Sequence, residues 1–186
     1  MSPTSGDLLA LQRPVTLLSH HPVHGALAEA LGAERAAASA TPPRLSVIRE
    51  PEPREGPLRA LARLMAEHPE ARLLLCPVDM PWLDLACLQA LIAAADEAAR
   101  REPAAAGWIH LAHDGQRPQP LLGLFPSLAS RRQRLEAALA GGERGVRRWL
   151  AGEDWRPVRL PPGPLRNVNH PEELPPSVSF PAANGP

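Results

Sequence analysis

The sequence contains no lysine and no tyrosine, and only two of its 186 residues are phenylalanine. All 20 basic side chains are therefore arginines, and 20 acidic side chains balance them to a formal net charge of zero. Proteins that bind nucleic acids usually carry a basic excess or a basic stripe on one face. We therefore expect no nucleic-acid partner.

Cysteine and long apolar runs are scarce as well. Cys76 and Cys87 are too few and too widely spaced for a disulfide framework or a structural zinc site. No apolar run is long enough to cross a bilayer, so no membrane span is predicted. Residues 1–11 lack the basic start and apolar stretch of a secretory signal peptide. These absences favour a cytoplasmic protein.

Proline, by contrast, is abundant, with 24 residues spread along the chain. The chain length predicts a single domain. Residues 175–186 read PPSVSFPAANGP, and we expect a flexible tail there because apolar side chains are few and show no period. We place the domain at residues 14–174, preceded by a short N-terminal segment at residues 1–13.

Short apolar runs alternate with helical patterns through the domain. Strands are predicted at residues 15–18, 45–48, 72–78, 107–112 and 120–125. Helices are predicted from Val23 to Gly32, at 57–68, after Asp84, from Ser127 to Gly141 and at 146–150. Asp84 and Ser127 are the expected N-caps. This alternation predicts an α/β fold with three layers, in which helices cover both faces of a mainly parallel sheet.

Ligands of such sheets bind at the carboxyl ends of the strands. Asp79 directly follows the most apolar predicted strand, within the segment CPVDMP at residues 76–81. A carboxylate at this place can hold a Mg²⁺ ion that bridges to phosphates. The alternative is that Asp79 only caps the turn before Pro81.

Three further segments have a composition that suits ligands. Gly56 and Pro57 stand at a helix start, where free N–H groups favour an anion, although an ordinary helix start has the same pattern. Asn167 and Asn169 flank one apolar residue, so their amides point the same way and either hold a ligand or shape a loop. The arginines within residues 131–134 can meet an anion, but such runs usually form a solvated helix face.

These segments occur in one order with EGPLRAL (55–61), DGQRPQPLLGLF (114–125), GERGVRRWL (142–150) and NVNHPEEL (167–174). The ordered set resembles the molybdenum cofactor guanylyltransferase (MobA-like) family of nucleotidyltransferases over residues 14–174. The resemblance implies a fold like that of nucleotide-diphospho-sugar transferases. It also implies a Mg²⁺-dependent enzyme that joins a guanylyl group from GTP to the phosphate of molybdopterin and releases pyrophosphate.

The resemblance assigns roles to individual residues. Asp79 matches the strand-end Asp of the family, which implies that it is the metal ligand and the catalytic residue. The nucleotide site is implied to include Ser19, Glu50, Gly56, Pro57 and Asp79, and Glu50 stands where the family has an aspartate. The molybdopterin site is implied to include Arg117, Gln119, Pro120, Asn167 and Asn169.

The beginning of the chain departs from the family pattern. The family starts with a strand and a glycine-rich loop, L-A-G-G-x-x-x-R-M-G followed by Asp-Lys, which together hold the triphosphate. Residues 1–13 look like the stretch that follows this loop, so the first strand and the loop are missing and catalysis is expected to be impaired.

Three explanations of this departure stay open. The coding start can lie upstream of Met1, or a partner can supply the loop. The third explanation is a non-catalytic binding or accessory protein for the molybdenum cofactor or a molybdoenzyme. Loss of the first strand would also expose strand edges, which a homodimer or a partner protein could cover.

Overall fold

The computed structural model describes residues 11, 13–19, 21, 23–38, 45–50 and 55–173. The strands are β1 (Val15–Ser19), β2 (Leu45–Arg49), β3 (Arg72–Leu75), β4 (Ile109–His113), β5 (Pro118–Pro126) and β6 (Trp155–Arg159). The α-helices are α2 (Val23–Ala38), α3 (Pro57–Glu67), α4 (Leu85–Arg101), α5 (Ala129–Ala140) and α6 (Val146–Leu150). Two 3₁₀ helices, η1 (Pro103–Gly107) and η2 (Pro171–Glu173), complete the order. The predicted tail at 175–186 and nearly all of the segment 1–13 lie outside the described residues.

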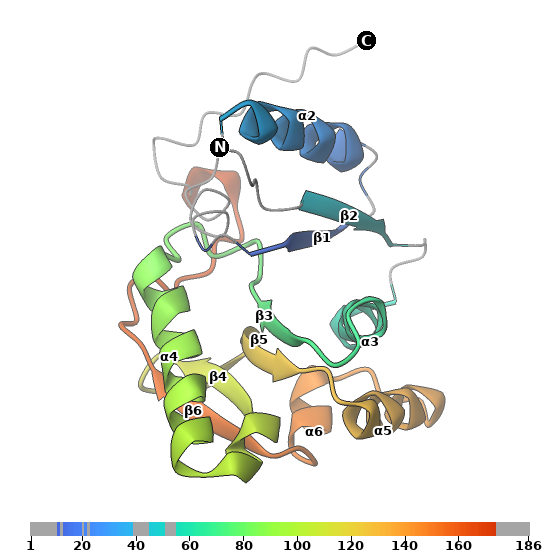
Figure 1. Cartoon of the computed structure of the whole chain (residues 1–186), viewed down its shortest axis with the longest axis vertical. Coiled ribbons are helices and arrows are strands. Elements are labelled where there is room, and N and C mark those ends of the chain that lie inside the picture. Colours follow the sequence, from blue (N-terminus) through green and yellow to red (C-terminus); the bar gives the residue numbers. More distant parts are fainter. Residues whose placement is uncertain are drawn as a thin grey trace.

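The strands form two separate sheets (Figure 1). β1 and β2 make a parallel pair. The larger sheet has the order β3-β5-β4-β6, in which β5 runs antiparallel to both β3 and β4, while β4 and β6 are parallel. β3 and β4 therefore run in the same direction, and their carboxyl ends lie at the same edge of the sheet.

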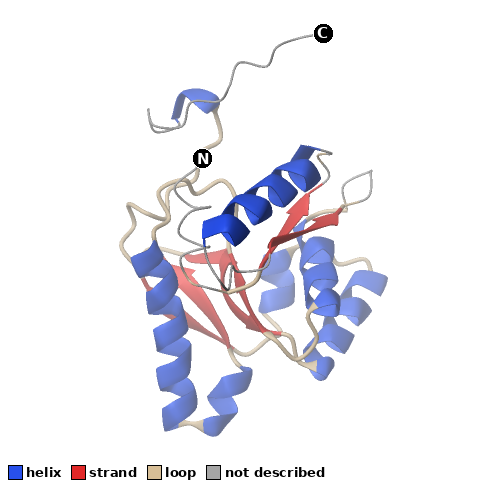
Figure 2. Ribbon diagram, turned by 45° about the horizontal axis from the view of Figure 1, so that its top comes forward, coloured by secondary structure: helices blue, strands red, loops and turns tan. Residues whose placement is uncertain are grey.

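Helices cover both faces of the larger sheet. On one face, α3, α5 and α6 enclose a core that includes Leu111 and Phe125 of the sheet. On the other face, α4 packs over Ala112 and Leu122. Figure 1 shows α4 on the side opposite α3, α5 and α6, and Figure 2 shows the same layers from a second direction. The predicted three-layer α/β fold is confirmed, with β5 as the antiparallel exception.

The apolar run of β3 is explained by this double cover. Leu73 and Leu75 pack against the core under α3 and α5, whereas Leu74 packs against the core under α4. Successive side chains of a strand point to opposite faces, so a strand between two helical layers is apolar throughout. The prediction of a strand before Asp79 is confirmed, but its leucines are partly buried, and β3 ends at Leu75 and not at Val78.

Helix boundaries were predicted correctly where a cap identifies them. The Asp84 side chain accepts a hydrogen bond from the N–H of Cys87 at 2.8 Å, as an N-cap does. The prediction for Ser127 was wrong: Leu128 is the cap residue of α5, and Ser127 Oγ donates to the carbonyl of Met65 at 2.7 Å. Ser127 therefore satisfies a buried carbonyl group of a different element.

One other prediction needs correction, and one strand was missed. α2 continues to Ala38, so Gly32 does not end it. An interior glycine costs about 1 kcal/mol, and the alanine-rich sequence on both sides of Gly32 favours the helix enough to offset that cost. β6 was not predicted, because Pro157 and two arginines are unusual in a strand. Among the described residues it is an edge strand that pairs with β4.

Among the described residues, β1 pairs with β2 and β3 ends one side of the larger sheet. In the part of the chain that the structure describes, no ladder joins β1 to β3. Thr16 Oγ1 of β1 and Nε2 of His68, which follows α3, are 2.9 Å apart and connect the two halves. Edge strands present unpaired N–H and C=O groups. The exposed edges predicted for a sheet without its first strand stay a prediction, because residues 1–10 lie outside the described part of the chain.

A buried ion pair holds α5 against the sheet. Arg131 Nε lies 2.8 Å from Glu153 Oε2, and the two side chains are only 3% and 2% exposed. The Arg131 guanidinium also donates to the carbonyl groups of Pro126 at 2.9 Å and Gly107 at 2.8 Å. Arg134 adds a second cation, 2.7 Å from Glu153. Arg131 therefore does not belong to a solvated face, which the arginine run had suggested.

No described helix combines the length and the apolar character that crossing a bilayer requires.

His110 should make the stability of the domain sensitive to acid. This residue of β4 is 3% exposed. Burial lowers the pKa of His110, and the charges of Arg156 and Arg72 lower it further. Below about pH 6.5, the usual pKa of histidine, the unfolded chain binds this proton before the folded chain does. The free energy of unfolding should then fall by about 1 kcal/mol per pH unit until the folded-state pKa is passed.

Urea unfolding at about pH 7 and about pH 5 tests this expectation. The substitution His110→Leu removes the titrating group and should weaken the pH dependence. The matched control is His170→Gln, because His170 is exposed. A pH dependence that is the same in wild type and His110→Leu would contradict the assignment.

Candidate functional site

Asp79 lies in the turn after β3, at the carboxyl edge of the larger sheet. Its carbonyl oxygen accepts a hydrogen bond from the N–H of Val168 at 2.8 Å. Its Oδ2 accepts a second hydrogen bond from Nδ2 of Asn167, also at 2.8 Å. Two segments that are far apart in the sequence, and that the sequence analysis singled out separately, are thus joined at one place.

The second carboxylate oxygen, Asp79 Oδ1, is shielded from solvent and has no hydrogen-bond partner among the described residues. A buried polar atom without a partner costs free energy, and the cost is larger for a charged group. This oxygen therefore favours a cation. Mg²⁺ usually takes one or two carboxylate ligands and completes its shell with water and substrate phosphates, so this single oxygen fits it.

Some metal sites are formed by protein side chains alone. Within residues 11–173, as far as the structure describes them, no three side chains of His, Cys, Asp or Glu are grouped so that they could hold a metal ion. The described carboxylates, histidines and cysteines would thus not complete the shell of a metal at Asp79 by themselves.

Asn169 does not repeat the contact of Asn167. Its side chain is exposed, and its backbone N–H donates to Glu173 Oε2 at 2.9 Å. The N–H of His170 donates to the same oxygen at 3.4 Å. These hydrogen bonds, that of Asn169 first, lower the pKa of Glu173. Asn167 therefore contacts Asp79 and Glu173 shapes the rest of the loop, while the ligand contacts expected of the two amides stay a prediction.

Ser19 and Glu50 are neighbours at the carboxyl ends of β1 and β2. The N–H of Glu50 donates to the carbonyl of Ser19 at 3.0 Å. Ser19 is buried, and its Oγ lies 2.6 Å from Nδ1 of His24 and accepts a hydrogen bond from the N–H of His21 at 3.1 Å. No hydrogen bond of the described residues joins this pair to Asp79, so the structure shows two groups of predicted site residues.

Gly56 and Pro57 form the start of α3. Gly56 has a φ of 88°, in the left-handed region that favours glycine, and the space where a Cβ would stand is open. Pro57 is the first helical residue. The first N–H groups of a helix have no partners within it and attract anions. Glu55, beside them, pairs with Arg63 and lies 3.7 Å from Arg59.

The residues predicted near molybdopterin at the start of β5 have internal partners. Gln119 is buried, and its Nε2 donates to Asp114 Oδ2 at 3.0 Å. Asp114 Oδ1 accepts the N–H groups of Gln116 and Arg117, both at 2.8 Å. The hydrogen bonds from Arg117 and Gln116 lower the pKa of Asp114. Asp114, which the sequence analysis did not single out, therefore holds this hairpin, and Pro120 lies within β5.

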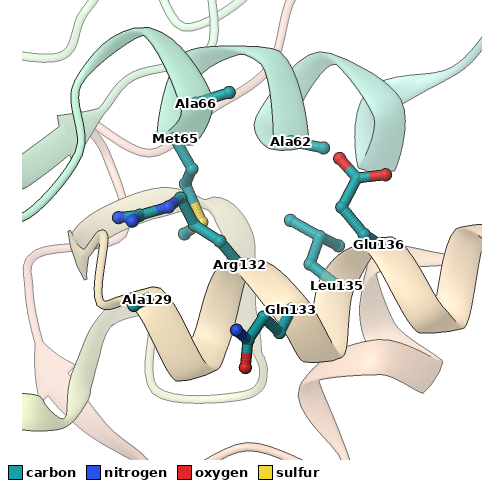
Figure 3. Close-up of a pocket in the computed structure, with 8 residues that line it drawn as sticks. All are labelled: Ala62, Met65, Ala66, Ala129, Arg132, Gln133, Leu135 and Glu136. Atoms are coloured by element: carbon teal, nitrogen blue, oxygen red, sulfur yellow. The ribbon is translucent and has the colours of Figure 1, made fainter.

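A cavity of about 460 Å³ lies between α3 and α5 (Figure 3). Its lining residues are Ala62, Met65, Ala66, Ala129, Arg132, Gln133, Leu135 and Glu136. Most of the cavity wall is apolar, and Arg132 is paired with Glu70 at 3.0 Å. It contains none of the predicted site residues, so the predicted chemistry does not belong to this cavity.

Comparison with known proteins gives two matches in sequence. The family described as MobA-like NTP transferase domain matches residues 7–158. A molybdenum cofactor guanylyltransferase of Pseudomonas syringae pv. syringae (strain B728a) is 40% identical over 103 residues, which cover 54% of this chain and 46% of the relative. The chain thus spans about half the length of this curated relative.

Solved structures resemble the chain at low sequence identity. A protein of Aquifex aeolicus VF5 (Aq1419) aligns with a TM-score of 0.57 and 12% identity, over 89% of this chain and 97% of its own. The molybdopterin-guanine dinucleotide biosynthesis protein A of Archaeoglobus fulgidus aligns with a TM-score of 0.49 and 15% identity, over 84% of this chain and 73% of its own. At such identity, the first likeness shows a shared fold. Because the family match extends over most of the sequence, the chain belongs to the MobA-like NTP transferase domain family.

Proposed function

We propose that this protein acts in molybdenum cofactor biosynthesis as a guanylyltransferase-like nucleotidyltransferase. Its substrates would be GTP and molybdopterin, with Mg²⁺ as cofactor. An oxygen of the molybdopterin phosphate attacks the α-phosphorus of GTP; the new P–O bond forms as the bond to the β-phosphate breaks, and pyrophosphate leaves. The family membership and the likeness to the Pseudomonas guanylyltransferase support this proposal.

The observation that carries the proposal is the environment of Asp79. One oxygen is held by Asn167 and the other is buried without a partner among the described residues. Asp79 would hold Mg²⁺ through Oδ1, while Asn167 fixes the direction of the carboxylate. When bound, Mg²⁺ would supply the positive charge that stabilises the transferred phosphate. Ser19 and Glu50 would contact the nucleotide, and Asn169 would face molybdopterin.

The lack of a ladder between β1 and β3 among the described residues favours a second candidate function. Unpaired strand edges invite another strand. The protein would then be a non-catalytic binding or accessory protein for the molybdenum cofactor or a molybdoenzyme, with the edges covered by a partner or by a second copy. A strictly monomeric mass in solution, even at micromolar protein concentration, would contradict the second copy.

Calorimetry with GTP and Mg²⁺ separates the two functions. We expect the wild type to bind GTP in the presence of Mg²⁺, and the substitution Asp79→Asn to weaken this binding by about tenfold or more, because it removes a charged ligand. The control is Asp154→Asn, which removes an exposed carboxylate outside the candidate site. Binding by neither wild type nor Asp79→Asn would contradict the enzyme and support the accessory protein.

A further inference from the structure

Arg166 is the cation closest in sequence to the Asp79–Asn167 contact. It directly precedes Asn167, whose amide holds the Asp79 carboxylate. The guanidinium carbon of Arg166 lies 4.5 Å from the centroid of the Trp82 ring. Trp82 itself follows Asp79 closely, after Met80 and Pro81. Both members of this stack are therefore tied to the two segments that meet at Asp79.

The stacked guanidinium keeps its donors available. Within the described residues, the Arg166 side chain donates no hydrogen bond and forms no ion pair. A cation–π contact holds the group over the ring through its face, which leaves the N–H groups at the edge unused. The charge of Arg166 helps to lower the pKa of Glu173, but Glu173 Oε2 already accepts hydrogen bonds from two backbone N–H groups. Arg166 is thus positioned without being neutralised.

A positioned guanidinium with unused donors suits a phosphate group. Its planar fork matches two oxygens of a phosphate, and such charge-assisted pairs are stronger than neutral hydrogen bonds. The chain has no lysine, so arginine supplies every long cationic side chain. A phosphorylated ligand seated at Asp79 would bring negative charge to the loop that carries Arg166.

We propose that Arg166, held over Trp82, binds a phosphate group of the ligand at the Asp79 site. This inference rests on the proposed function and adds a residue to it. The group that Arg166 would bind is a phosphate dianion. It can belong to the triphosphate of GTP or to the phosphate monoester of molybdopterin. Trp82 acts as a positioning residue, since it would touch the guanidinium and not the phosphate.

The chain offers a matched control for the test. Arg156 lies over Trp108, with its guanidinium carbon 4.0 Å from the ring centroid. Arg156 is the second residue of β6, and Trp108 directly precedes β4. Because β4 and β6 are parallel, this stack lies at the amino ends of both strands, at the edge of the sheet opposite Asp79. Both stacks place an arginine over a tryptophan ring and they differ in place, although Arg156 also donates to the carbonyl of Trp155 at 3.0 Å.

Calorimetric titrations of the full chain with Mg²⁺–GTP, and separately with inorganic phosphate, test the proposal. We expect Arg166→Gln to weaken binding by about ten- to hundredfold, because a charge-assisted hydrogen bond is lost. Trp82→Leu should weaken binding by a few-fold, because Arg166 keeps its charge but loses the aromatic ring that positions it. Trp82→Phe keeps an aromatic ring and should restore most of the lost affinity. Arg156→Gln should change neither titration.

The two probes distinguish the two sources of the phosphate. Weaker GTP binding by Arg166→Gln would assign Arg166 to the triphosphate, whereas weaker binding of inorganic phosphate alone would assign it to the phosphate of molybdopterin.

The result that overturns the proposal is equal binding of both probes by wild type and Arg166→Gln. If Asp79→Asn still abolishes GTP binding in that case, the proposed function survives and only the role of Arg166 fails. If the wild type binds neither probe, both fail. Circular dichroism of each variant confirms that the compared proteins are folded.

Discussion

The substitution Glu153→Ala should lower the free energy of unfolding by about 3–5 kcal/mol, because it leaves a buried charge without its partner. Arg131 would keep its hydrogen bonds to the carbonyl groups of Pro126 and Gly107 but lose its counter-charge. Its side chain is 3% exposed, so water cannot replace the carboxylate. Urea unfolding followed by circular dichroism measures the change.

The control for this experiment is Glu97→Ala. Glu97 pairs with Arg100 and Arg101 on the surface of α4, where side chains are 44% to 78% exposed. Exposed ion pairs contribute about 0–1 kcal/mol, so this variant should unfold almost like the wild type. If the two variants lost equal stability, the buried pair would not have the role that we assign to it.

The same ion pair predicts a loss of stability in acid. Burial alone raises the pKa of Glu153, but the hydrogen bonds from Arg134 and Arg131 outweigh it, and the net shift is downward. A carboxyl group with a lowered folded-state pKa stabilises the fold above its ordinary pKa, about 4.3. This stabilisation is lost as the pH falls from there through the lower, folded-state pKa.

Under the proposed function, the substitution Asp79→Asn should reduce the rate of guanylyl transfer by about 10²–10³-fold. The amide keeps the size of the carboxylate and can still accept the hydrogen bond from Asn167, so the loop should keep its shape. What it lacks is the negative charge that would hold Mg²⁺ at the phosphates. Release of pyrophosphate from GTP in the presence of molybdopterin measures the rate.

Two comparisons make this result specific. Asp154→Asn should leave the rate unchanged, because its exposed carboxylate lies outside the candidate site. Excess Mg²⁺ should restore part of the rate of Asp79→Asn if the defect is weak metal binding. A rate of Asp79→Asn equal to that of the wild type would show that the reaction uses another carboxylate.

Local sequence rules were enough to place Asp79. The unbroken apolar run of β3 predicts a strand covered on both faces, and the structure has Asp79 in the turn that follows this strand, at its carboxyl end. The contact with Asn167 could not be predicted in this way, because it joins segments that are distant in sequence. The local pattern predicts that the amides of Asn167 and Asn169 point the same way, but only the folded chain shows which residue each amide contacts.

Arg131 and Ser127 illustrate why other features escaped prediction. Arg131 stands in a run of arginines typical of a solvated helix face, and its burial depends on Glu153 and on two carbonyl groups from other elements. Ser127 has the position of an N-cap, yet its hydroxyl group donates to the Met65 carbonyl of α3. In both cases a distant polar group competes successfully with the local preference of the residue.

Under the proposed function, Oδ1 of Asp79 is a metal ligand at a nucleotide site. A crystal grown with GTP and Mn²⁺, which replaces Mg²⁺ and scatters X-rays anomalously, tests it most directly. We predict an anomalous peak within about 2.3 Å of Asp79 Oδ1, a normal distance between such a cation and a carboxylate oxygen. Bound GTP with its Mn²⁺ at another place, and no peak beside Asp79, would contradict the account.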